Sequence, residues 1–481
     1  MGSVISNAIA SAVLSEIMPT DEEIEKQITV IESLKFALER YATDNGFPYH
    51  SIEPQGSTGR KQTQLRGASD IDLFVILSQD DYPEELSQDP KRRRDAIDNL
   101  MNGMVENWFK PALSGIKVNS LQKTYSQHPY LSLEMMGFEV DIVSCFFIPQ
   151  SDLKRTGPIT AMDRTIHHSE YVFNNIGLLR DDVRILKSFV RACHAYADRC
   201  AVGQMGFTGY ALELLVILKG GVDEAIRAIL ELDVIPVDPF HRSLEDLGKM
   251  PAFRDDKIFI MDPIDPGRNV ASSFDNRSFR LLKVLSARLI SAAEKGNSSK
   301  VQELLLEKPI PTTAVPKWFE KHSSVHEFKS DGSIHYTILR DKIHSFARKA
   351  ANELSRENTG EPRFGEILTE VYLEGSSYAV GFIIEKPMIS EKYERKGPPM
   401  SLKNASDSFR QAHPDAIERD GYLWIEEFRR WTSAEDHVAS LIESVSINGL
   451  ALTSKSETSS KLLNIMMNWV LLAEPDFPSL K

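Results

Sequence analysis

The chain has 481 residues and a mass of 54.2 kDa, enough for about two to four domains and for a core that folds without disulfide or metal. Hydrophobic residues make up 42% and charged residues 26%, which excludes a collagen, a pure coiled coil and a fully disordered chain. The formal net charge is −13, so the overall charge gives no support for a nucleic-acid-binding protein. The acidic excess lies mainly in residues 1–150, whereas residues 151–290 are balanced.

The cysteines indicate a reducing compartment. Cys145, Cys193 and Cys200 show no Cys-x-x-Cys spacing, so we expect neither a disulfide framework nor a thiolate zinc site. The N-terminus lacks the pattern of a signal peptide, and the densest apolar run, over residues 212–218, is too short to span a membrane. We therefore expect a cytoplasmic protein without a membrane segment.

The N-terminal part predicts one helix followed by strands. A capping box at Thr20 begins the helix, and Gly46 follows its apolar periodicity as a stop. In the last strand of this part, Asp141 alternates with apolar side chains and so lies on the opposite face. The predicted elements are a helix over residues 20–45, a polar loop over 56–69, and strands over 71–77, 131–135 and 138–143.

Another helix is predicted to begin at Asp89-Pro90, with proline at its first position. Its first turn carries the basic run from Lys91 to Arg94. We interpret this run as a solvated basic turn, with a contact to RNA as the alternative.

The rest of the chain first becomes helical and then, beyond about residue 290, α+β. Ser330-Asp331-Gly332 has the composition of a hairpin turn. We expect a small C-terminal sheet with helices packed on one face. The predicted elements are helices over 183–197, 210–218 and 342–354, strands over 325–328, 334–339 and 378–384, and linkers or exposed loops over 309–316 and 386–399.

Three aspartates form the strongest chemical hypothesis. Asp70 and Asp72 stand two residues apart at the start of a strand, so their side chains point to the same face. If Asp141 lies on a neighbouring strand and faces the same way, three carboxylates converge, which suits one or two Mg²⁺ ions. Two such ions would activate a hydroxyl and stabilise a leaving pyrophosphate. For a lone Asp-x-Asp pair, the alternative is a solvated strand end.

Gly56 and Ser57 strengthen the metal hypothesis. A glycine lets the backbone approach a phosphate closely, and the serine hydroxyl and the amides can bind its oxygens.

These motifs resemble a known family. Gly56-Ser57, residues 70–75 (Asp-Ile-Asp-Leu-Phe-Val) and residues 140–143 (Val-Asp-Ile-Val) look like the three-part signature of the nucleotidyltransferase superfamily related to DNA polymerase beta. Further segments resemble the archaeal-type (class I) CCA-adding enzymes, or tRNA nucleotidyltransferases. These segments are residues 128–130, 163–168, 183–189, 206–215 and 262–271. The resemblance is continuous over about residues 20–285 and weaker afterwards, where residues 397–399 and 421–424 are the landmarks.

The resemblance implies an α+β fold in three parts. Residues 1–152 would form a catalytic palm-type mixed sheet with helices. Residues 153–290 would form a central, mainly helical nucleotide-binding domain, and residues 291–481 a C-terminal α+β region that binds tRNA by shape and phosphates.

The resemblance also assigns site residues. It implies that Asp70, Asp72 and Asp141 are the catalytic, metal-binding carboxylates, and that Arg268, with Asp265 near it, helps to read the base. The positions that match nucleotide-binding residues are Gly56, Ser57, Arg60, Thr165, His168, Lys187, Tyr196 and Arg268.

The residues themselves support one part of this assignment and leave two points of it open. Lys187 and Arg191 lie on one predicted helix and would supply positive charge for a triphosphate. Because His167 precedes His168, the sequence leaves open which imidazole faces the nucleotide. The loop from Ser57 to Asp70 is one residue longer than the family pattern, which leaves the place of Arg60 open.

The implied activity is template-independent addition of C, C and A to the 3′ end of tRNA from CTP and ATP, with two Mg²⁺ ions as cofactor. Another template-independent transferase on the same core, such as a poly(A) polymerase or an oligoadenylate or cyclic-dinucleotide synthase, is the alternative. A catalytically silent RNA-binding scaffold is the third hypothesis, which the intact aspartates disfavour. The sequence leaves open whether the chain forms a homodimer and how addition stops after three nucleotides.

Overall fold

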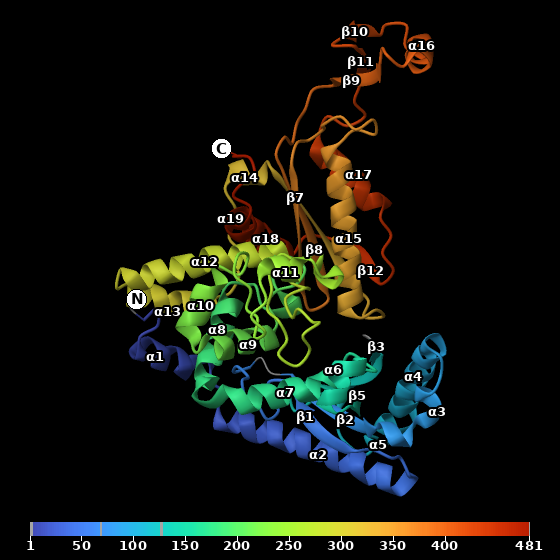
Figure 1. The fold of residues 1–481 in the computed structure, drawn as a ribbon. Coiled ribbons are helices and arrows are strands. Elements are labelled where there is room, and N and C mark those ends of the chain that lie inside the picture. Colours follow the sequence, from blue (N-terminus) through green and yellow to red (C-terminus); the bar gives the residue numbers. More distant parts are fainter. Residues whose placement is uncertain (1–2, 68–69, 126–127, 481) are drawn as a thin grey trace. The chain divides into compact units, whose positions relative to one another are not determined.

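The computed structural model describes residues 3–67, 70–125 and 128–480 (Figure 1). The chain divides into two compact units, which we call the N-terminal unit and the C-terminal unit. The N-terminal unit comprises Met1–Ala197, Phe207–Phe274 and Leu282–Glu307, and the C-terminal unit comprises Asp198–Gly206, Asp275–Leu281 and Lys308–Lys481. The N-terminal unit therefore holds most of the first two predicted domains, whose boundaries at residues 152 and 290 stay predictions. None of the described helices combines the length and the apolar run needed to span a membrane.

A five-stranded mixed sheet organises the first part of the N-terminal unit. Its strand order is β1-β2-β5-β4-β3, with β2 and β5 parallel and the other pairs antiparallel. The elements are α1 (Asn7–Ile17), α2 (Asp21–Asn45), β1 (Ser51–Gln55), β2 (Ile71–Ser78), α3 (Pro83–Leu86), α4 (Pro90–Met104), α5 (Lys110–Ala112), β3 (Asn119–Tyr125), β4 (Pro129–Met135), β5 (Phe138–Phe147) and α6 (Gln150–Thr156). The predicted helix and strands of this part are confirmed, and Thr20 caps α2 by accepting a hydrogen bond from the Glu23 amide.

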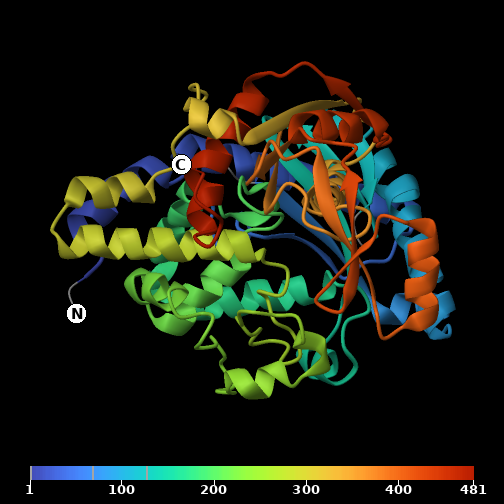
Figure 2. The same cartoon turned by 90° about the horizontal axis from the view of Figure 1, so that it is seen from above.

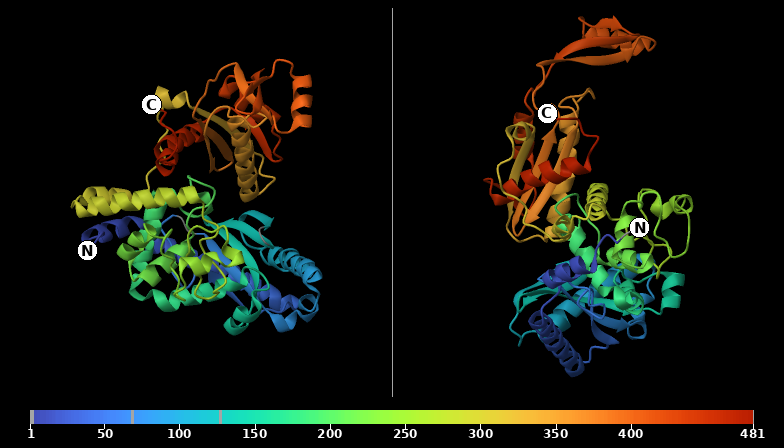
Figure 3. Two further views of the ribbon diagram at one scale, coloured as in Figure 1. Left: turned by 45° about the horizontal axis from the view of Figure 1, so that its top comes forward. Right: turned by 90° about the vertical axis from the view of Figure 1, so that its left-hand side faces the viewer.

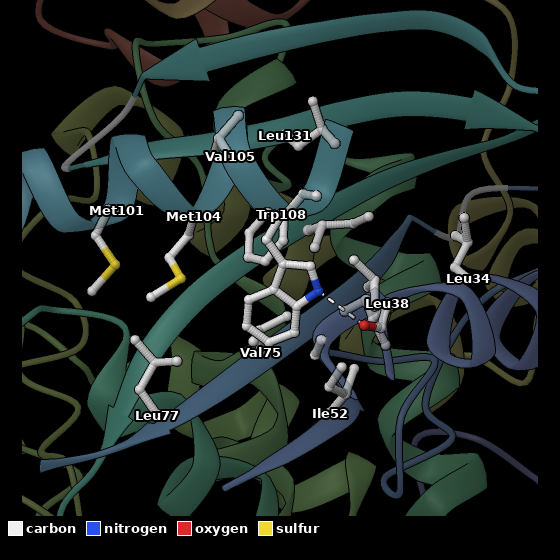
Figure 4. Close-up of a cluster of buried hydrophobic side chains, with 14 of the residues drawn as sticks. Leu34, Leu38, Ile52, Val75, Leu77, Met101, Met104, Val105, Trp108 and Leu131 are labelled. Carbon is white, nitrogen blue, oxygen red and sulfur yellow. Dashed lines mark hydrogen bonds between the residues drawn. The ribbon is translucent and has the colours of Figure 1, made fainter. Parts of the chain in front are cut away.

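One face of this sheet carries the main core. Alternate residues of β2 and β5 pack there against α2, α4 and the π-helical turn Val105–Phe109. The fully buried Trp108 lies at its centre (Figure 4), and its indole Nε1 donates a hydrogen bond to the carbonyl of Leu38 at 2.9 Å. This bond satisfies the polar atom of a large buried aromatic side chain.

The opposite face of the sheet meets α7. Phe74 and Ile76 of β2 and Val143 and Cys145 of β5 form a second, smaller cluster there. Because side chains alternate along a strand, Asp72 and Asp141 share this face with them.

Helices make up the remainder of the N-terminal unit: α7 (Asp163–Ile176), α8 (Arg180–Ala192), α9 (Gly209–Lys219), α10 (Val222–Ile229), α11 (Leu244–Gly248), α12 (Asn276–Glu294) and α13 (Ser298–Leu305). The first residues of α12 count with the C-terminal unit. After Gly296 the chain turns back into α13, as the two yellow helices in Figure 2 show. Most of α9 is buried, so this helix lies inside the unit.

The C-terminal unit contains two antiparallel sheets, with strand orders β12-β6-β8-β7 and β10-β11-β9. The four strands of the larger sheet lie side by side in the right-hand view of Figure 3. The elements are α14 (Lys317–Glu320), β6 (Ser323–Ser330), α15 (Tyr336–Ser355), β7 (Ile367–Glu374), β8 (Ser377–Ile384), β9 (Lys392–Pro399), α16 (Lys403–Ala412), β10 (Ile417–Arg419), β11 (Tyr422–Phe428), α17 (Ala434–Ser444), β12 (Leu450–Thr453), α18 (Glu457–Ile465) and α19 (Leu471–Ala473). The predicted α+β fold class is confirmed.

Two predictions for the larger sheet are wrong. No second hairpin strand forms over 334–339, because β6 pairs with the distant strands β8 and β12 and the chain enters α15 at Tyr336. Helices also cover both faces of the sheet instead of one. The side chains of α15 and α17 pack on one face, while Leu462 and Met466 lie against Gly381 on the other.

The predicted loop over 386–399 is also partly wrong, because its second half is the strand β9. The Gly-Pro-Pro sequence at its end resembles a loop, but β9 is an edge strand, where proline is tolerated. The linker predicted over 309–316 contains no helix or strand, as expected.

Candidate functional site

The carboxylates of Asp72 and Asp141 lie on neighbouring parallel strands at the same level. Asp72 of β2 is in register with Asp141 of β5, and both side chains point to the face that meets α7. Burial, together with repulsion from Asp141 and Asp70, raises the pKa of Asp72 to about 7, and Lys61 opposes this shift. Asp70 and Asp141 are therefore both close enough to Asp72 to act on its carboxylate.

The chemistry of this group fits Mg²⁺. Among the described residues, no three His, Cys, Asp or Glu side chains stand in a ready-made arrangement around a metal position. Mg²⁺ does not require one, because it is typically held by one or two carboxylates together with waters and substrate phosphates. A cation between Asp72 and Asp141 would also offset the repulsion that raises the pKa of Asp72.

Gly56 stands directly beside these carboxylates. It follows the last residue of β1 with a φ of 65°, a left-handed conformation that favours glycine. A Cβ at this position would also collide with the carboxylate of Asp72. Glycine at this position therefore suits both the turn and the close approach of the Asp72 carboxylate to the backbone. Ser57 comes next in the chain, at the start of the loop toward β2.

Two lysines and one glutamate form a buried cluster in the same unit. Lys61 Nζ lies 2.9 Å from Glu213 Oε2, and Lys187 Nζ lies 2.8 Å from Glu213 Oε1. The Thr63 hydroxyl donates a hydrogen bond to Glu213 at 2.6 Å and accepts one from Lys187 at 2.8 Å. We call Lys61, Thr63, Lys187 and Glu213 the lysine cluster.

The loop after Ser57 is held in place by α8. Arg180 donates a hydrogen bond to the carbonyl of Lys61, and Arg184 donates bonds to the carbonyls of Gln62 and Gln64. The basic side chains of α8 therefore fix the loop backbone as well as adding charge. Arg191, which was predicted to supply charge for a triphosphate, pairs with Glu307 at 2.9 Å.

Tyr196 borders the lysine cluster. A Cβ at Gly209 would lie 3.0 Å from the Tyr196 hydroxyl and 3.5 Å from Lys187 Nζ, which brings these two groups to the same point. Burial and the charge of Glu213 raise the pKa of Tyr196 to about 12, so its hydroxyl stays a hydrogen-bond donor at neutral pH. Gly209 allows this contact, because a larger residue would crowd both side chains.

Asp262 joins three polar side chains into a second network. His168 Nε2 and Arg268 Nη1 each lie 2.8 Å from Asp262 Oδ2, and the Tyr210 hydroxyl donates to Oδ1 at 3.0 Å. Burial alone would raise the pKa of Asp262, but the bonds from His168 and Arg268 lower it, so Asp262 stays ionised. The ring of His168 also stacks on Tyr210, with 4.3 Å between the centroids.

His167 and His168 face different surroundings. His167 is buried and bonded to the carbonyl of Ile148 at 2.7 Å, so it serves the packing of α7. Thr165 precedes His168 by three residues on the same helix and so lies on the same side. Of the two imidazoles, His168 is therefore the one beside Arg268. Arg164 pairs with Asp265 at 2.7 Å and so holds the loop that carries Arg268.

Comparison with known proteins identifies relatives. The family model described as "tRNA nucleotidyltransferase, second domain" matches residues 181–297. The CCA-adding enzyme of Methanosarcina mazei is 26% identical over 455 residues, which cover 90% of this chain and 88% of that protein. The chain is similar to archaeal CCA-adding enzymes over most of its length. The CCA-adding enzyme of Thermoplasma acidophilum is 32% identical over 285 residues, 59% of this chain, and the match spans 57% of that relative's length.

Solved structures add a weaker likeness. The structure of E. coli MS115-1 CdnC with ATP aligns with a TM-score of 0.43 and 19% identity, covering 63% of this chain and 95% of that one. The Cid1 structures align with similarly low scores, for example a TM-score of 0.45 at 14% identity. Neither likeness bears on the activity of this chain.

The residues predicted from the resemblance to CCA-adding enzymes gather unevenly. Lys187 and Tyr196 meet at the lysine cluster, and His168 and Arg268 meet at Asp262. Arg60 does not join them, because its side chain is 62% exposed and pairs with Glu53.

Sequence reasoning missed the residues that hold these groups. Lys61, the residue after Arg60, is the buried cation of the loop. Glu213, Asp262 and Tyr210 lie in the segments that resemble the family, but the sequence assigned them no role of their own. The longer loop and its two adjacent cations were the available signal for Lys61, since a one-residue insertion moves the inward position by one.

Proposed function

We propose that the chain is a nucleotidyltransferase that adds C, C and A to the 3′ end of tRNA from CTP and ATP without a template, with release of pyrophosphate. The observation that carries this proposal is the register of Asp72 with Asp141, on the sheet face that meets the helices. The relationship to CCA-adding enzymes supplies the substrates.

In this proposal Asp70, Asp72 and Asp141 hold Mg²⁺, most simply as two ions. When bound, the metal supplies Lewis-acid stabilisation of the charge that develops on the α-phosphate and the leaving pyrophosphate. The 3′-oxygen of the tRNA attacks the α-phosphorus, the bond to the bridging oxygen of pyrophosphate breaks, and the hydroxyl proton passes to a carboxylate, for which Asp141 is the proposed acceptor.

The chain's own cations and donors hold the triphosphate. The loop at Gly56 and Ser57 would approach its oxygens with amides and a hydroxyl. Lys61 and Lys187 would neutralise the charge that accumulates on the leaving group, while Tyr196 donates a hydrogen bond. Because these groups are already ordered, little reorganisation is needed when the nucleotide binds.

The network at Asp262 would position the base and the sugar. Arg268 offers several donors to a Watson–Crick edge, and its pairing with Asp262 fixes the direction of the guanidinium. His168 and Thr165 would contact the nucleotide beside it. A site built from such fixed polar groups discriminates strongly, because a wrong base leaves them unpaired.

The partner proposed for the C-terminal region over 291–481 is the acceptor stem of the tRNA. Its recognition by shape and phosphates makes affinity depend on local basic patches, despite the acidic net charge. A homodimer is a further proposal, and light scattering distinguishes the 54.2 kDa monomer from twice that mass. The unpaired cysteines support a cytoplasmic location.

The direct test incubates the protein with Mg²⁺, labelled CTP and ATP, and a tRNA that lacks its last three nucleotides. Growth by two C and one A, ending there, is the expected result. Long A tails, or products made from nucleotides alone, would overturn the proposed specificity in favour of another transferase. No product at all with intact tRNA binding would favour a silent scaffold.

A further inference from the structure

Glu213 is a buried carboxylate to which neither the sequence motifs nor the proposed reaction assigns a role. It lies on α9, and its side chain is only 1% exposed. One oxygen receives Lys187 and the Thr63 hydroxyl, and the other receives Lys61. These three partners of Glu213 are the other members of the lysine cluster.

This carboxylate balances the charge of two buried lysines. The side chain of Lys61 is 8% exposed and that of Lys187 is 2% exposed, so both ammonium groups are largely removed from water. Two buried ammonium groups that bond the same carboxylate repel each other, and the negative charge between them offsets this repulsion. The lysines in turn hold the pKa of Glu213 at about 2 against the effect of burial, so the carboxylate is ionised at neutral pH.

Glu213 also joins two distant parts of the sequence. Lys61 and Thr63 lie in the loop that begins at Gly56 and Ser57, whereas Lys187 and Glu213 lie on α8 and α9. The same carboxylate therefore fixes the phosphate-approaching loop to the helices that carry Lys187 and approach Tyr196.

We propose that Glu213 is a positioning residue that holds the ammonium groups of Lys61 and Lys187 at the spacing that receives the triphosphate of the incoming nucleotide. The inference rests on the proposed function, because that function assigns a nucleotide to these lysines. Glu213 itself acts through the two lysines and Thr63 without contacting the nucleotide.

The test compares Glu213→Gln with wild type in CCA addition and in binding. We expect the KM for CTP and for ATP to rise about tenfold or more, while the KM for tRNA changes by less than about twofold. Binding of CTP without tRNA, measured by calorimetry, should weaken by the same factor. Glu213→Asp, which keeps the charge, should recover part of the loss.

Asp238→Asn is the matched control. Asp238 is an equally buried carboxylate, paired with Arg242 at 2.7 Å in the same unit and outside the lysine cluster. Asp238→Asn should lower the melting temperature about as much as Glu213→Gln does, yet leave the KM for CTP unchanged. A rise of the KM in both variants would show a general structural effect and overturn the inference.

Two further measurements keep the inference testable if Glu213→Gln does not fold. Thr63→Val keeps all three charges and removes the hydroxyl that joins Glu213 to Lys187, so it should raise the KM for CTP several-fold. In a Lys187→Met background, Glu213→Gln or Thr63→Val should add little. The inference would be overturned if either change raised the KM for CTP in the Lys187→Met background by as much as it does alone. It would also be overturned if Thr63→Val and Glu213→Gln both kept the wild-type KM for CTP. Failure of the proposed function is distinct, since wild type itself would then not extend tRNA, while CTP binding would still report on Glu213.

Discussion

Replacing Asp72 with asparagine should stabilise the N-terminal unit at about pH 8 while abolishing nucleotide transfer. Burial and the neighbouring aspartates raise the pKa of Asp72 from 3.8 to about 7 in the folded chain. Between these values the folded state keeps a proton that the unfolded state has released, so the stability that Asp72 contributes falls as the pH rises through this window. Above about pH 7 the loss is complete.

The shift sets the size of the effect. About three pKa units at about 1.36 kcal/mol each give an upper limit of about 4 kcal/mol. Asp72 is only partly buried in the folded chain, so solvent screening reduces the expected gain to about 1–2 kcal/mol. For a unit of this size, that corresponds to a rise in melting temperature of about 3–6 °C at about pH 8 and clearly less at about pH 5.

Thermal unfolding, followed by fluorescence at about pH 8 and about pH 5, measures the difference in melting temperature between Asp72→Asn and wild type. Asp95→Asn, on the exposed side of α4, is the control and should leave the melting temperature unchanged. Millimolar Mg²⁺ should stabilise wild type at about pH 8 more than Asp72→Asn, because the variant has lost one carboxylate. An Asp72→Asn chain that is no more stable than wild type at about pH 8 would refute the clustering of the three carboxylates. A variant that retains transfer activity would refute the proposed metal-binding role of Asp72.

Other changes test separate parts of the site and the core. Lys61→Met should raise the KM for CTP about tenfold or more, while Arg60→Met should change it less than about twofold, because only Lys61 lies in the lysine cluster. Steady-state kinetics measure both values, and a larger effect of Arg60→Met would refute the prediction. Asp262→Asn should increase incorporation of U and G, because Arg268 loses the carboxylate that fixes its guanidinium. Sequencing of the product ends measures this incorporation, and unchanged fidelity would contradict the role of the network. Trp108→Ala should lower the free energy of unfolding by about 3–5 kcal/mol in denaturant titrations, and a loss below about 1 kcal/mol would contradict its place in the core. The affinity for tRNA should fall as salt rises, and a salt-insensitive affinity in filter binding would contradict recognition through phosphates.

Much of the catalytic face could be predicted from local sequence. A continuous β-branched and aromatic run predicted β2, and alternating apolar residues predicted β5. The spacing of Asp70 and Asp72 placed both carboxylates on one side of a strand. Gly56 was predicted to let the backbone approach a phosphate, and the structure adds that it adopts a left-handed φ of 65°. These features depend on residues within a few positions of one another, which is why a pattern is sufficient to predict them.

The partners of these elements could not be predicted in the same way. The strand over residues 325–328 was expected to pair with its neighbour in sequence, but β6 pairs with β8 and β12. A strand's pattern states which side chains are apolar, but it does not state which other strand supplies the hydrogen bonds. That choice depends on the packing of the whole unit.

The sequence by itself determined the candidate chemistry of this protein: three aspartates, a glycine and serine turn, and segments similar to CCA-adding enzymes. Only the tertiary structure decided which of two adjacent residues joins a buried polar network. Lys61 is buried while Arg60 is exposed, and His168 reaches Asp262 while His167 packs into the core. Adjacent residues point in different directions from the backbone, so the register of a loop or helix against its neighbours selects one and excludes the other.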